Sequence, residues 1–305
     1  MSAREEKVGL FFAGLCALNG AFVPGLAKLT TNRSDPLFVA VATATFGGVF
    51  AAGVLALRGE LGWLTRPGVR GRLAVIGTLG TAAAFLLFYA GTHRASAIEA
   101  ALCLQSEPAY SLVLSWLALG HRPTPRRVMA TALLLSGIAL AVGIQGFRAS
   151  AGVWFLLATP LCWQLSHLIV LRGLPGTPPL VLTGARYIWG GLVLVACFLA
   201  GRGIGGLPAT HELPHILPIL ALQGVVFAYL GTVFWYQSIA RLDLGRATAI
   251  VVPSIPVLSL GASWLLVGEL ASARQWAGLA MTLSGVVAFV MAPQAKPMGR
   301  ATSRR

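Results

Sequence analysis

The sequence predicts an all-α integral membrane protein with ten transmembrane helices, arranged as two inverted five-helix repeats. Three observations support this fold class: the composition, a series of apolar windows and an internal repeat. Of the 305 residues, 56% are hydrophobic and only 10% are charged, and the mean hydropathy is +0.78. Soluble domains contain about 25% charged residues, so the composition excludes a chain made of one or two soluble domains.

The repeat is visible near the middle and near the end of the chain. Gln105–Gly120 and Val252–Gly268 both end in Ser-Trp-Leu-x-x-Gly, and they align without a gap at an offset of 148 residues (264 minus 116). At the same offset, Leu133–Val142 matches Met281–Val290. We therefore expect two copies of one unit.

Windows of about twenty apolar residues give the elements in order. The first window follows Arg4 and Lys7, as in a signal peptide, but it is long enough to span and supplies the first helix. The first copy, residues 1–147, contains Val8–Lys28, Pro36–Leu57, Leu73–Gly91, Ala97–Leu119 and Val128–Ile144. The second copy, residues 148–305, contains Val153–Leu171, Pro179–Leu199, Leu217–Ile239, Arg246–Val267 and Trp276–Met291, followed by a short basic tail. Because five is an odd number, the second copy enters the membrane from the opposite side, and the repeats are inverted.

Lysine and arginine gather on one side of the predicted membrane. With both termini placed in the cytoplasm, the inner segments hold 16 of these residues and the outer segments hold 6, while Arg186 lies within a predicted helix. This bias follows the positive-inside rule. We expect a multi-pass protein of the cell inner (plasma) membrane with both termini cytoplasmic.

Prolines interrupt the fourth predicted helix of each copy. A proline leaves the carbonyl four residues earlier without its helical donor, so Pro108, Pro253 and Pro256 free three carbonyl groups. In hydrocarbon such groups must face protein or a wet cavity, and matching breaks in two repeats are typical of a transport pathway. The three prolines are therefore candidate gating residues. The alternative is that they form ordinary tolerated kinks.

Glu107 is the most informative charge in the chain. It lies about ten residues into its window, so a rise of ~1.5 Å per residue places it ~15 Å deep, near the middle of a ~30 Å core. A carboxylate there costs on the order of 2.5–3.5 kcal/mol on insertion scales, so it should face the bundle interior and have a partner or be protonated. Arg186 lies about 10 Å inside its helix and either reaches inward or extends to the interface. The alternative for Glu107 is a carboxyl that only holds helices together.

Other polar and aromatic residues recur at helical spacing. Tyr229, Thr232 and Tyr236 do so in one helix, and Phe85 and Tyr89 do so in another. Such stripes form either a packed core or the wall of a cavity, where aromatic faces hold flat or cationic solutes. The candidate substrate-binding set is Asn19, Phe85, Tyr89, Glu107, Tyr110, Trp163, Gln164, His167, Arg186, Tyr229, Trp235 and Tyr236.

Several remaining signals favour structure over chemistry. His211-Glu212-Leu213-Pro214-His215 has the order of a zinc-protease motif, but Pro214 is incompatible with the continuous helix that the motif needs, and we expect an exposed loop. All four cysteines lie in apolar segments without metal-site spacing. The basic residues lie in short connectors, so we expect no nucleic-acid partner. The sequence contains no catalytic triad, phosphate loop or metal cluster, and we expect no enzyme activity, no metal and no cofactor.

Short motifs resemble the drug/metabolite transporter superfamily, EamA type. They are the prolines in the fourth helix of each copy, Gly268-Glu269 at the end of the second of these helices, and Leu283-Ser284-Gly285-Val286 in the last helix. Lys28 at the end of the first helix and Arg186 after Pro179 also match this pattern. The first copy departs from it, with Gly120-His121 in place of Gly-Glu and Thr43 in place of the arginine.

The resemblance implies export or exchange of small organic metabolites, often amino acids, through a central cavity. We therefore expect a secondary transporter that works by alternating access, with a small-molecule substrate and the lipid bilayer as partners and the oligomeric state open. The alternatives are a nucleotide-sugar or lipid-linked carrier, a membrane enzyme and a structural scaffold. An enzyme would need a juxtamembrane cluster of acids, histidines or cysteines, and a scaffold would not need Glu107.

The glycines Gly137 and Gly285, with Gly278 nearby, should mark where the fifth and tenth helices pack closely against neighbouring helices.

Overall fold

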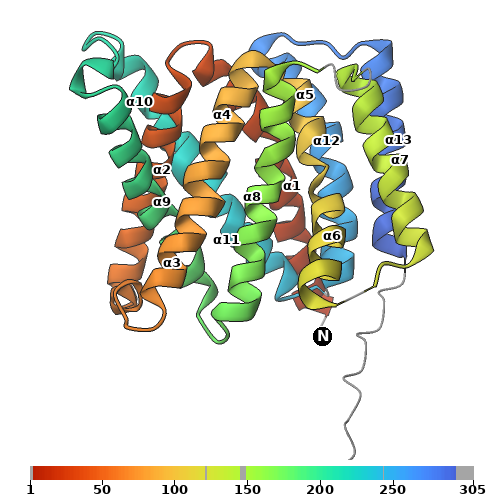
Figure 1. Cartoon of the computed structure of the whole chain (residues 1–305), viewed down its shortest axis with the longest axis horizontal. Coiled ribbons are helices and arrows are strands. Elements are labelled where there is room, and N and C mark those ends of the chain that lie inside the picture. Colours follow the sequence, from red (N-terminus) through yellow and green to blue (C-terminus); the bar gives the residue numbers. More distant parts are fainter. Residues whose placement is uncertain (1–2, 121, 145–148, 243, 293–305) are drawn as a thin grey trace, which may run out of the picture.

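A computed structural model of the chain describes residues 3–120, 122–144, 149–242 and 244–292. Throughout these ranges the regular structure is helical, without β-strands, which confirms the predicted all-helical class. The helices run side by side through one bundle (Figure 1). Their bounds are α1 Ala3–Thr31, α2 Pro36–Leu57, η1 Leu61–Leu64, α3 Arg70–Gly77, η2 Thr78–Ala83, α4 Ala84–Arg94, α5 Ala97–Leu104, α6 Glu107–Leu119, α7 Pro125–Val142, α8 Ala151–Gly173, α9 Pro179–Gly201, η3 Ile204–Gly206, α10 Leu213–Leu222, η4 Gln223–Leu230, α11 Gly231–Ile239, α12 Leu244–Val267 and α13 Ala273–Met291.

Eight helices in the described part of the chain are long and apolar enough to cross a membrane. The predicted windows Ala97–Leu119 and Trp276–Met291 are not among them. The first window is broken into two shorter helices, and the helix of the second, α13, opens with the polar residues Arg274 and Gln275. The chain is therefore a multi-pass, all-helical membrane protein.

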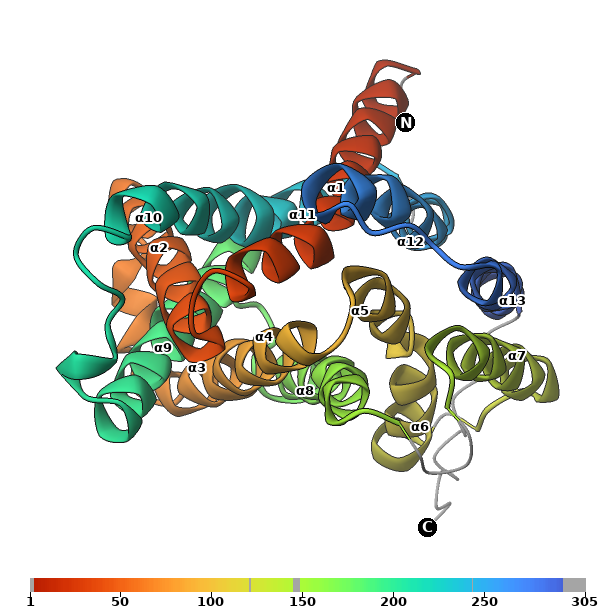
Figure 2. The same ribbon diagram turned by 90° about the horizontal axis from the view of Figure 1, so that it is seen from above.

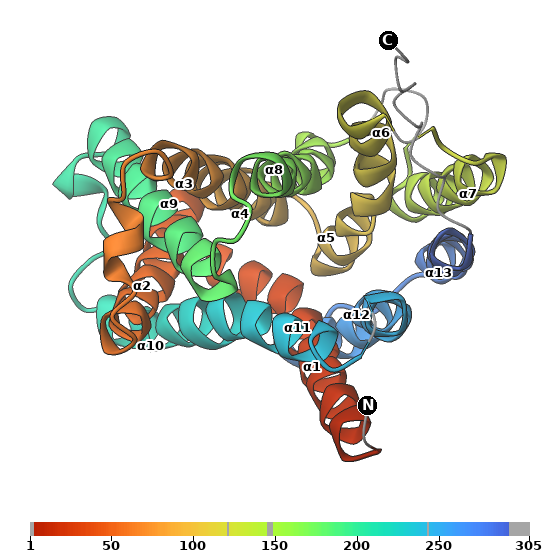
Figure 3. The same cartoon turned by 90° about the horizontal axis from the view of Figure 1, so that it is seen from below.

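The predicted continuous helix Ala97–Leu119 is wrong at its centre. The helix α5 ends at Leu104, and α6 begins at Glu107 with proline in its first turn (Figure 3). Pro108 has no N–H to donate to the Leu104 carbonyl, and the N–H groups of Gln105 and Ser106 instead form tight turns to carbonyls three residues earlier, at 3.0 Å each. In the other copy, Pro253 and Pro256 lie within the continuous helix α12, so the two copies respond differently to proline.

The third helix of each copy contains a π-helical segment. In the first copy η2 lies between α3 and α4, and in the second η4 lies between α10 and α11. A π segment adds a residue to the turn and changes which side chains share a face. Tyr229 lies in η4 and is 1% exposed, whereas Tyr236 in α11 is partly exposed. The two tyrosines were expected to share one face of a regular helix. Instead, Tyr229 is buried in the core and Tyr236 is partly exposed.

The closest helix pairs join the two copies to each other. These pairs are α1 with α12, α2 with α9, α4 with α8, and α7 with α13. Seen along the bundle, α7 and α13 lie together at one edge, far from α2 and α10 (Figure 2). A Cβ added at Gly137 would lie 2.5 Å from the Thr282 nitrogen, and one at Gly285 would lie 2.5 Å from the Leu134 nitrogen. The expected close packing through these glycines is confirmed.

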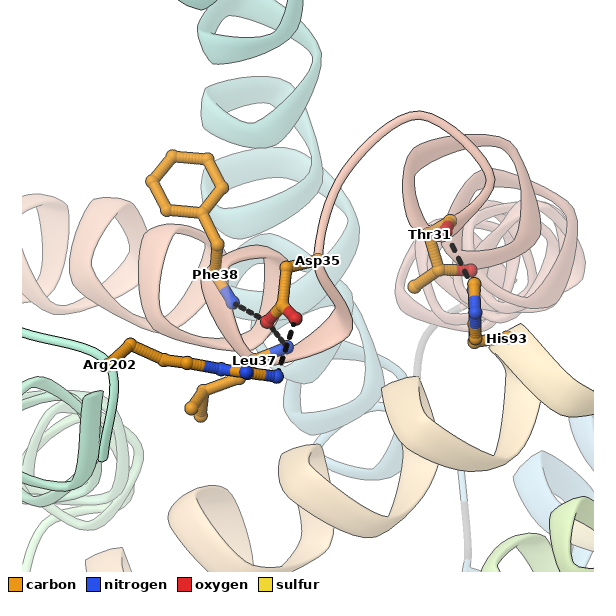
Figure 4. A network of polar contacts seen from close by, with 6 residues as sticks. All are labelled: Thr31, Asp35, Leu37, Phe38, His93 and Arg202. Atoms are coloured by element: carbon orange, nitrogen blue, oxygen red, sulfur yellow. Dashed lines mark hydrogen bonds and ion pairs between the residues drawn. The ribbon is translucent and has the colours of Figure 1, made fainter. Parts of the chain in front are cut away.

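Polar caps fix the helix ends at one end of the bundle (Figure 4). Asp35 accepts hydrogen bonds from the first-turn N–H groups of Leu37 and Phe38 and forms a 3.0 Å ion pair with Arg202 at the end of α9. The Nδ1 atom of His93, at the end of α4, donates to the Thr31 carbonyl at 2.8 Å. Such contacts satisfy helix-end groups that lack partners within their own helix.

Lys28 and Glu269, which carry part of the family resemblance, also act as caps. The Lys28 ammonium donates to the Thr92 and His93 carbonyls at 3.2 and 3.1 Å, at the C-terminal end of α4. The Glu269 carboxylate, after α12, accepts from the N–H groups of Ala97 and Ile98 at 2.8 and 3.3 Å, at the start of α5. Each charge therefore has the sign that the helix dipole favours. The altered residue of the first copy, His121, lies outside the described residues.

Candidate functional site

The break between α5 and α6 determines the position of Glu107. Because α6 starts at this residue, the carboxylate lies in a helical first turn, where the helix dipole favours negative charge. From α8, the Gln164 amide donates to Glu107 Oε1 at 2.7 Å. The partner of the Glu107 carboxylate is therefore an uncharged amide, and the second carboxylate oxygen has no hydrogen-bond partner in the described part of the chain.

Arg186 approaches the same region from α9. Its Nη2 donates to the Gly80 carbonyl of η2 at 2.8 Å, while its Nε is inaccessible and has no hydrogen-bond partner in the structure. Its charge acts on Glu107 and His167, and also on Tyr236 of α11. Even so, no acidic side chain in the described ranges forms an ion pair with it. Two opposite charges thus share one region without contact.

The members of this polar cluster come from four elements and are all accessible to solvent-sized molecules. Glu107, Gln164, Arg186 and Tyr236 are each partly exposed, and His167 is exposed. Charged side chains within a membrane span rarely face lipid, so this cluster is a candidate lining for an internal polar space. We therefore define these five residues as the candidate site.

Three aromatic residues of the predicted set lie outside the candidate site. Phe85, Tyr89 and Tyr229 are 9%, 2% and 1% exposed and belong to the hydrophobic core. The Tyr89 hydroxyl accepts a 2.7 Å hydrogen bond from the Gln223 amide, whose oxygen accepts from Thr30 at 3.3 Å. In this conformation these aromatic rings lie within the packed core instead of at an accessible surface.

Asn19 and Tyr110 bind backbone carbonyls. The Asn19 amide donates to Val226 in η4 at 2.8 Å, and the Tyr110 hydroxyl donates to Leu157 in α8 at 2.9 Å. Trp163 and Trp235 are partly exposed, and Trp235 packs beside a cluster of α1 and α12 residues. Tyr110, Trp163 and Trp235 lie close to cluster residues in the sequence, but no hydrogen bond joins them to the cluster in the described residues.

Two residues of this region were not identified from the sequence. A Cβ added at Gly80 would lie 2.7 Å from Ser166 Oγ and 2.9 Å from Arg186 Nε, so this glycine leaves space for the guanidinium. Gln223 is 2% exposed and joins α1, α4 and η4 through its hydrogen bonds. Gln223 could have been singled out from the sequence, because it is an amide side chain within a predicted apolar window. The need for glycine at position 80 could not, because it depends on tertiary packing.

The motif at residues 211–215 is at the surface. His211, Glu212 and His215 are exposed, and α10 begins within the motif at Leu213, with Pro214 in its first turn. The expectation of a loop is therefore wrong for its second half, because proline is tolerated in a helical first turn. Among the described residues, no three metal-binding side chains come together around a common point.

Comparisons with known proteins identify the family. The model of the EamA-like transporter family matches residues 7–143 and again residues 150–291. A "Probable terminal-alkyne amino-acid exporter" of Streptantibioticus cattleyicolor is 28% identical over 275 residues, covering 86% of this chain and 83% of that protein. The "Uncharacterized inner membrane transporter YedA" of Escherichia coli K12 is 30% identical over 138 residues, covering 43% of this chain and 41% of the transporter.

A solved structure shares the fold. It is described only as "Crystal structure of protein", and it aligns with a TM-score of 0.63 at 19% identity, covering 94% of this chain and 96% of its own. The two family matches together take in most of the sequence and fit a chain made of two related halves. Membership points to transport rather than catalysis. This protein belongs to the EamA-like transporter family.

Proposed function

We propose that the protein carries a small zwitterionic metabolite, an amino acid or a close relative, across the inner membrane by alternating access. In this proposal the chain crosses the membrane ten times. The eight apolar spans supply eight of the crossings, and α5–α6 and α13 supply the other two. Residues 1–147 and 148–305 form the two inverted repeats, and both termini are cytoplasmic. The site lies near the midplane, between the repeats.

The arrangement of Glu107 and Arg186 is the observation that carries this proposal. Both side chains are partly exposed, the second Glu107 oxygen has no hydrogen-bond partner in the described residues, and Glu107 and Arg186 do not pair with each other. A zwitterion placed between them would supply an ammonium for the carboxylate and a carboxylate for the guanidinium, so both charges would be compensated at once. The name of the Streptantibioticus relative, an amino-acid exporter, supports the same substrate class.

The aromatic residues of α8 and α11 would accommodate the apolar part of the solute. In the sequence, Trp163 precedes Gln164 and Trp235 precedes Tyr236. All four side chains are partly exposed. Aromatic side chains add apolar contact area with few rotatable bonds, which suits a site that must bind and release its ligand. Gating would use the break before Pro108 and the two prolines of α12.

Transport assays with matched ligands test the proposal. The purified full-length protein is screened by thermal shift against amino acids, nucleotide sugars and quaternary amines, and stabilising compounds are then followed into proteoliposomes. Wild type should prefer an amino acid over both its deaminated acid and its decarboxylated amine. Loss of one charge-assisted hydrogen bond should weaken binding by roughly 10- to 100-fold.

The variants separate the two ends of the solute. Glu107→Gln should remove the preference for the amino acid over the deaminated acid, and Arg186→Gln should remove the preference over the amine. The exposed residues Glu212 and Arg33 provide controls as Glu212→Gln and Arg33→Gln. Equal loss of all three ligands in both site variants would contradict recognition of a zwitterion, and stabilisation by nucleotide sugars alone would contradict the substrate class.

A further inference from the structure

A groove on the outer edge of the bundle combines apolar walls with unpaired positive charge. It lies between α7 and α13, which pack together at this edge (Figures 2 and 3). Its volume is about 660 Å³, and its lining consists of Arg126, Met129, Ala130, Leu133, Ala288, Met291 and Ala292. The buried residue Ala130 lies between the two helices, while the exposed side chains of Met129, Leu133 and Met291 project on both sides.

The charge is concentrated at one end of this groove. Arg126 is exposed and lines the groove, and Arg127 beside it is held in place. The Arg127 guanidinium lies 5.0 Å from the centre of the Phe289 ring and donates to the Ala292 carbonyl at 3.4 Å, while its inaccessible Nε has no hydrogen-bond partner. Neither α7 nor α13 contains an acidic residue. No ion pair neutralises either arginine within the described part of the chain.

We propose that this groove binds an anionic phospholipid, with an acyl chain between Met129, Leu133 and Ala288 and the headgroup phosphate at Arg126 and Arg127. The ligand must be apolar along most of its length and negative at one end, which is the chemistry of such a lipid. Arginine is suited to phosphate because its guanidinium offers several donors in one plane. The sequence beyond Ala292 adds Lys296, Arg300, Arg304 and Arg305, which increases the positive charge after α13.

A second copy of the chain fits this face less well. Two copies in one membrane would be related by a two-fold axis along the membrane normal, so the same residues would face each other at the same depth. Arg126 would then lie opposite the partner's arginine, and like charges without an anion between them repel. Lipid binding therefore explains both the apolar groove and its charge, and it does not depend on the transport proposal.

Lipid binding to the full-length protein tests this proposal. The purified protein is titrated with phosphatidylglycerol or with phosphatidylcholine of the same acyl chains, and bound lipid is counted by native mass spectrometry. Wild type should retain phosphatidylglycerol preferentially. Arg126→Gln with Arg127→Gln should weaken its retention by roughly 10- to 30-fold, because each basic residue near the headgroup contributes to the attraction.

Two further variants distinguish a loss of lipid binding from a loss of folding. Arg126→Gln alone removes a charge that forms no hydrogen bond or ion pair with the described residues, and it should reduce the preference without affecting the fold. Ala288→Phe fills the groove from an exposed position and should reduce binding while leaving both arginines intact. The control is Arg70→Gln with Arg172→Gln, which removes the same charge at the same end of the bundle (Figure 1).

Three results would overturn the proposal. Equal loss of phosphatidylglycerol in the control and in the groove variants would show an unspecific effect of net charge. Competition by inorganic phosphate alone at equal concentration would show an anion site that needs no lipid. A dimer that persists without lipid and dissociates in Ala288→Phe would show that the groove is a contact between copies of the chain.

Discussion

Arg186 is held by backbone and by the absence of a side chain at Gly80. Its Nη2 is bound to the Gly80 carbonyl, and the same glycine leaves room for its Nε. The π-helical segment that contains Gly80 therefore orients the positive charge of the candidate site. In our proposal, Gly80 does not contact the substrate, but it controls the position of Arg186, which does.

Replacing Gly80 by Ala should displace this guanidinium. The new Cβ would lie 2.9 Å from Arg186 Nε and 2.7 Å from Ser166 Oγ, and overpacking of this kind costs about 1–3 kcal/mol. We expect transport to fall about tenfold or more while the protein still folds. Transport rates in proteoliposomes and melting temperatures measure the two effects. Gly53→Ala is the matched control, because a Cβ there meets nothing within 4 Å.

At this scale the sequence located the charges but not their partners. The apolar window around Glu107 predicts a position deep in the membrane, which stays a prediction, and Gln164 was among the predicted residues. The hydrogen bond between them forms where the predicted helix is broken, because α6 begins at Glu107. If Gln164→Leu leaves Glu107 without this donor, the lost partner should cost about 1–3 kcal/mol.

This second prediction has a direct check. The melting temperature of Gln164→Leu should fall below that of wild type, and the added change Glu107→Gln should recover part of the loss because it removes the charge. A double variant that is less stable than the single one would contradict the assignment of Gln164 as the partner of this carboxylate. Both measurements use protein in the same detergent, so the comparison does not depend on an absolute free energy.

At the scale of elements, charged caps connect helices that are distant in sequence. Glu269 follows α12 and caps α5, and Lys28 ends α1 and caps α4. These two residues were recognised only through a family resemblance, and the structure supplies a physical reason for their presence. Their charges stabilise the ends of helices that surround the candidate site.

Glu269→Ala should therefore destabilise the start of α5. Loss of an N-terminal cap costs about 0.5–2 kcal/mol, and 1 kcal/mol corresponds to roughly 2–4 °C in melting temperature for chains of about 150–250 residues. Glu269→Gln should lose less, because the amide oxygen still accepts a hydrogen bond. Glu212→Ala, at an exposed position, serves as the control. Equal melting temperatures for Glu269→Ala and wild type would show that the cap is not needed.

The prolines of α12 give a prediction for gating. Replacing Pro253 and Pro256 by Ala should raise the melting temperature, because proline costs about 3 kcal/mol in a helix interior. Transport should slow severalfold if these prolines allow α12 to bend during the cycle. Pro218→Ala provides the control, since this proline is also inside a helix but is exposed in α10. Unchanged transport in the double variant would make the two prolines ordinary kinks.

At the scale of the whole molecule, the two copies are interlocked. Each of the most closely packed helix pairs consists of one helix from the first copy and one from the second. Neither half therefore buries its apolar surface alone. The ends of the chain are also related, because α1 begins and α13 ends at the same end of the bundle (Figure 1). This common end agrees with the expected arrangement of an even number of crossings.

Reporter fusions test the orientation of that end. The count of 16 basic residues inside against 6 outside predicts that tags before Ser2 and after Arg305 are both inaccessible from outside intact cells. A tag in the exposed connector after α9, at Arg202, should be accessible. If either terminal tag reacts from outside, the proposed orientation and the even number of crossings cannot both be correct.

The sequence by itself determined the helical membrane class, the internal repeat and the family resemblance. Each of these depends on local composition or on spacing along the chain, and both can be counted directly. The tertiary structure decided the break at Gln105 and Ser106, the π segments, the burial of Tyr89 and Tyr229, and the packing of Arg186 against Gly80. The packing of Arg186 against Gly80 and the hydrogen bonds of Glu107 and Asn19 arise where helices from opposite halves meet, and they join residues about 60 to more than 200 positions apart. Spacing within one helix predicts which side chains share a face, but it does not specify which helix that face contacts.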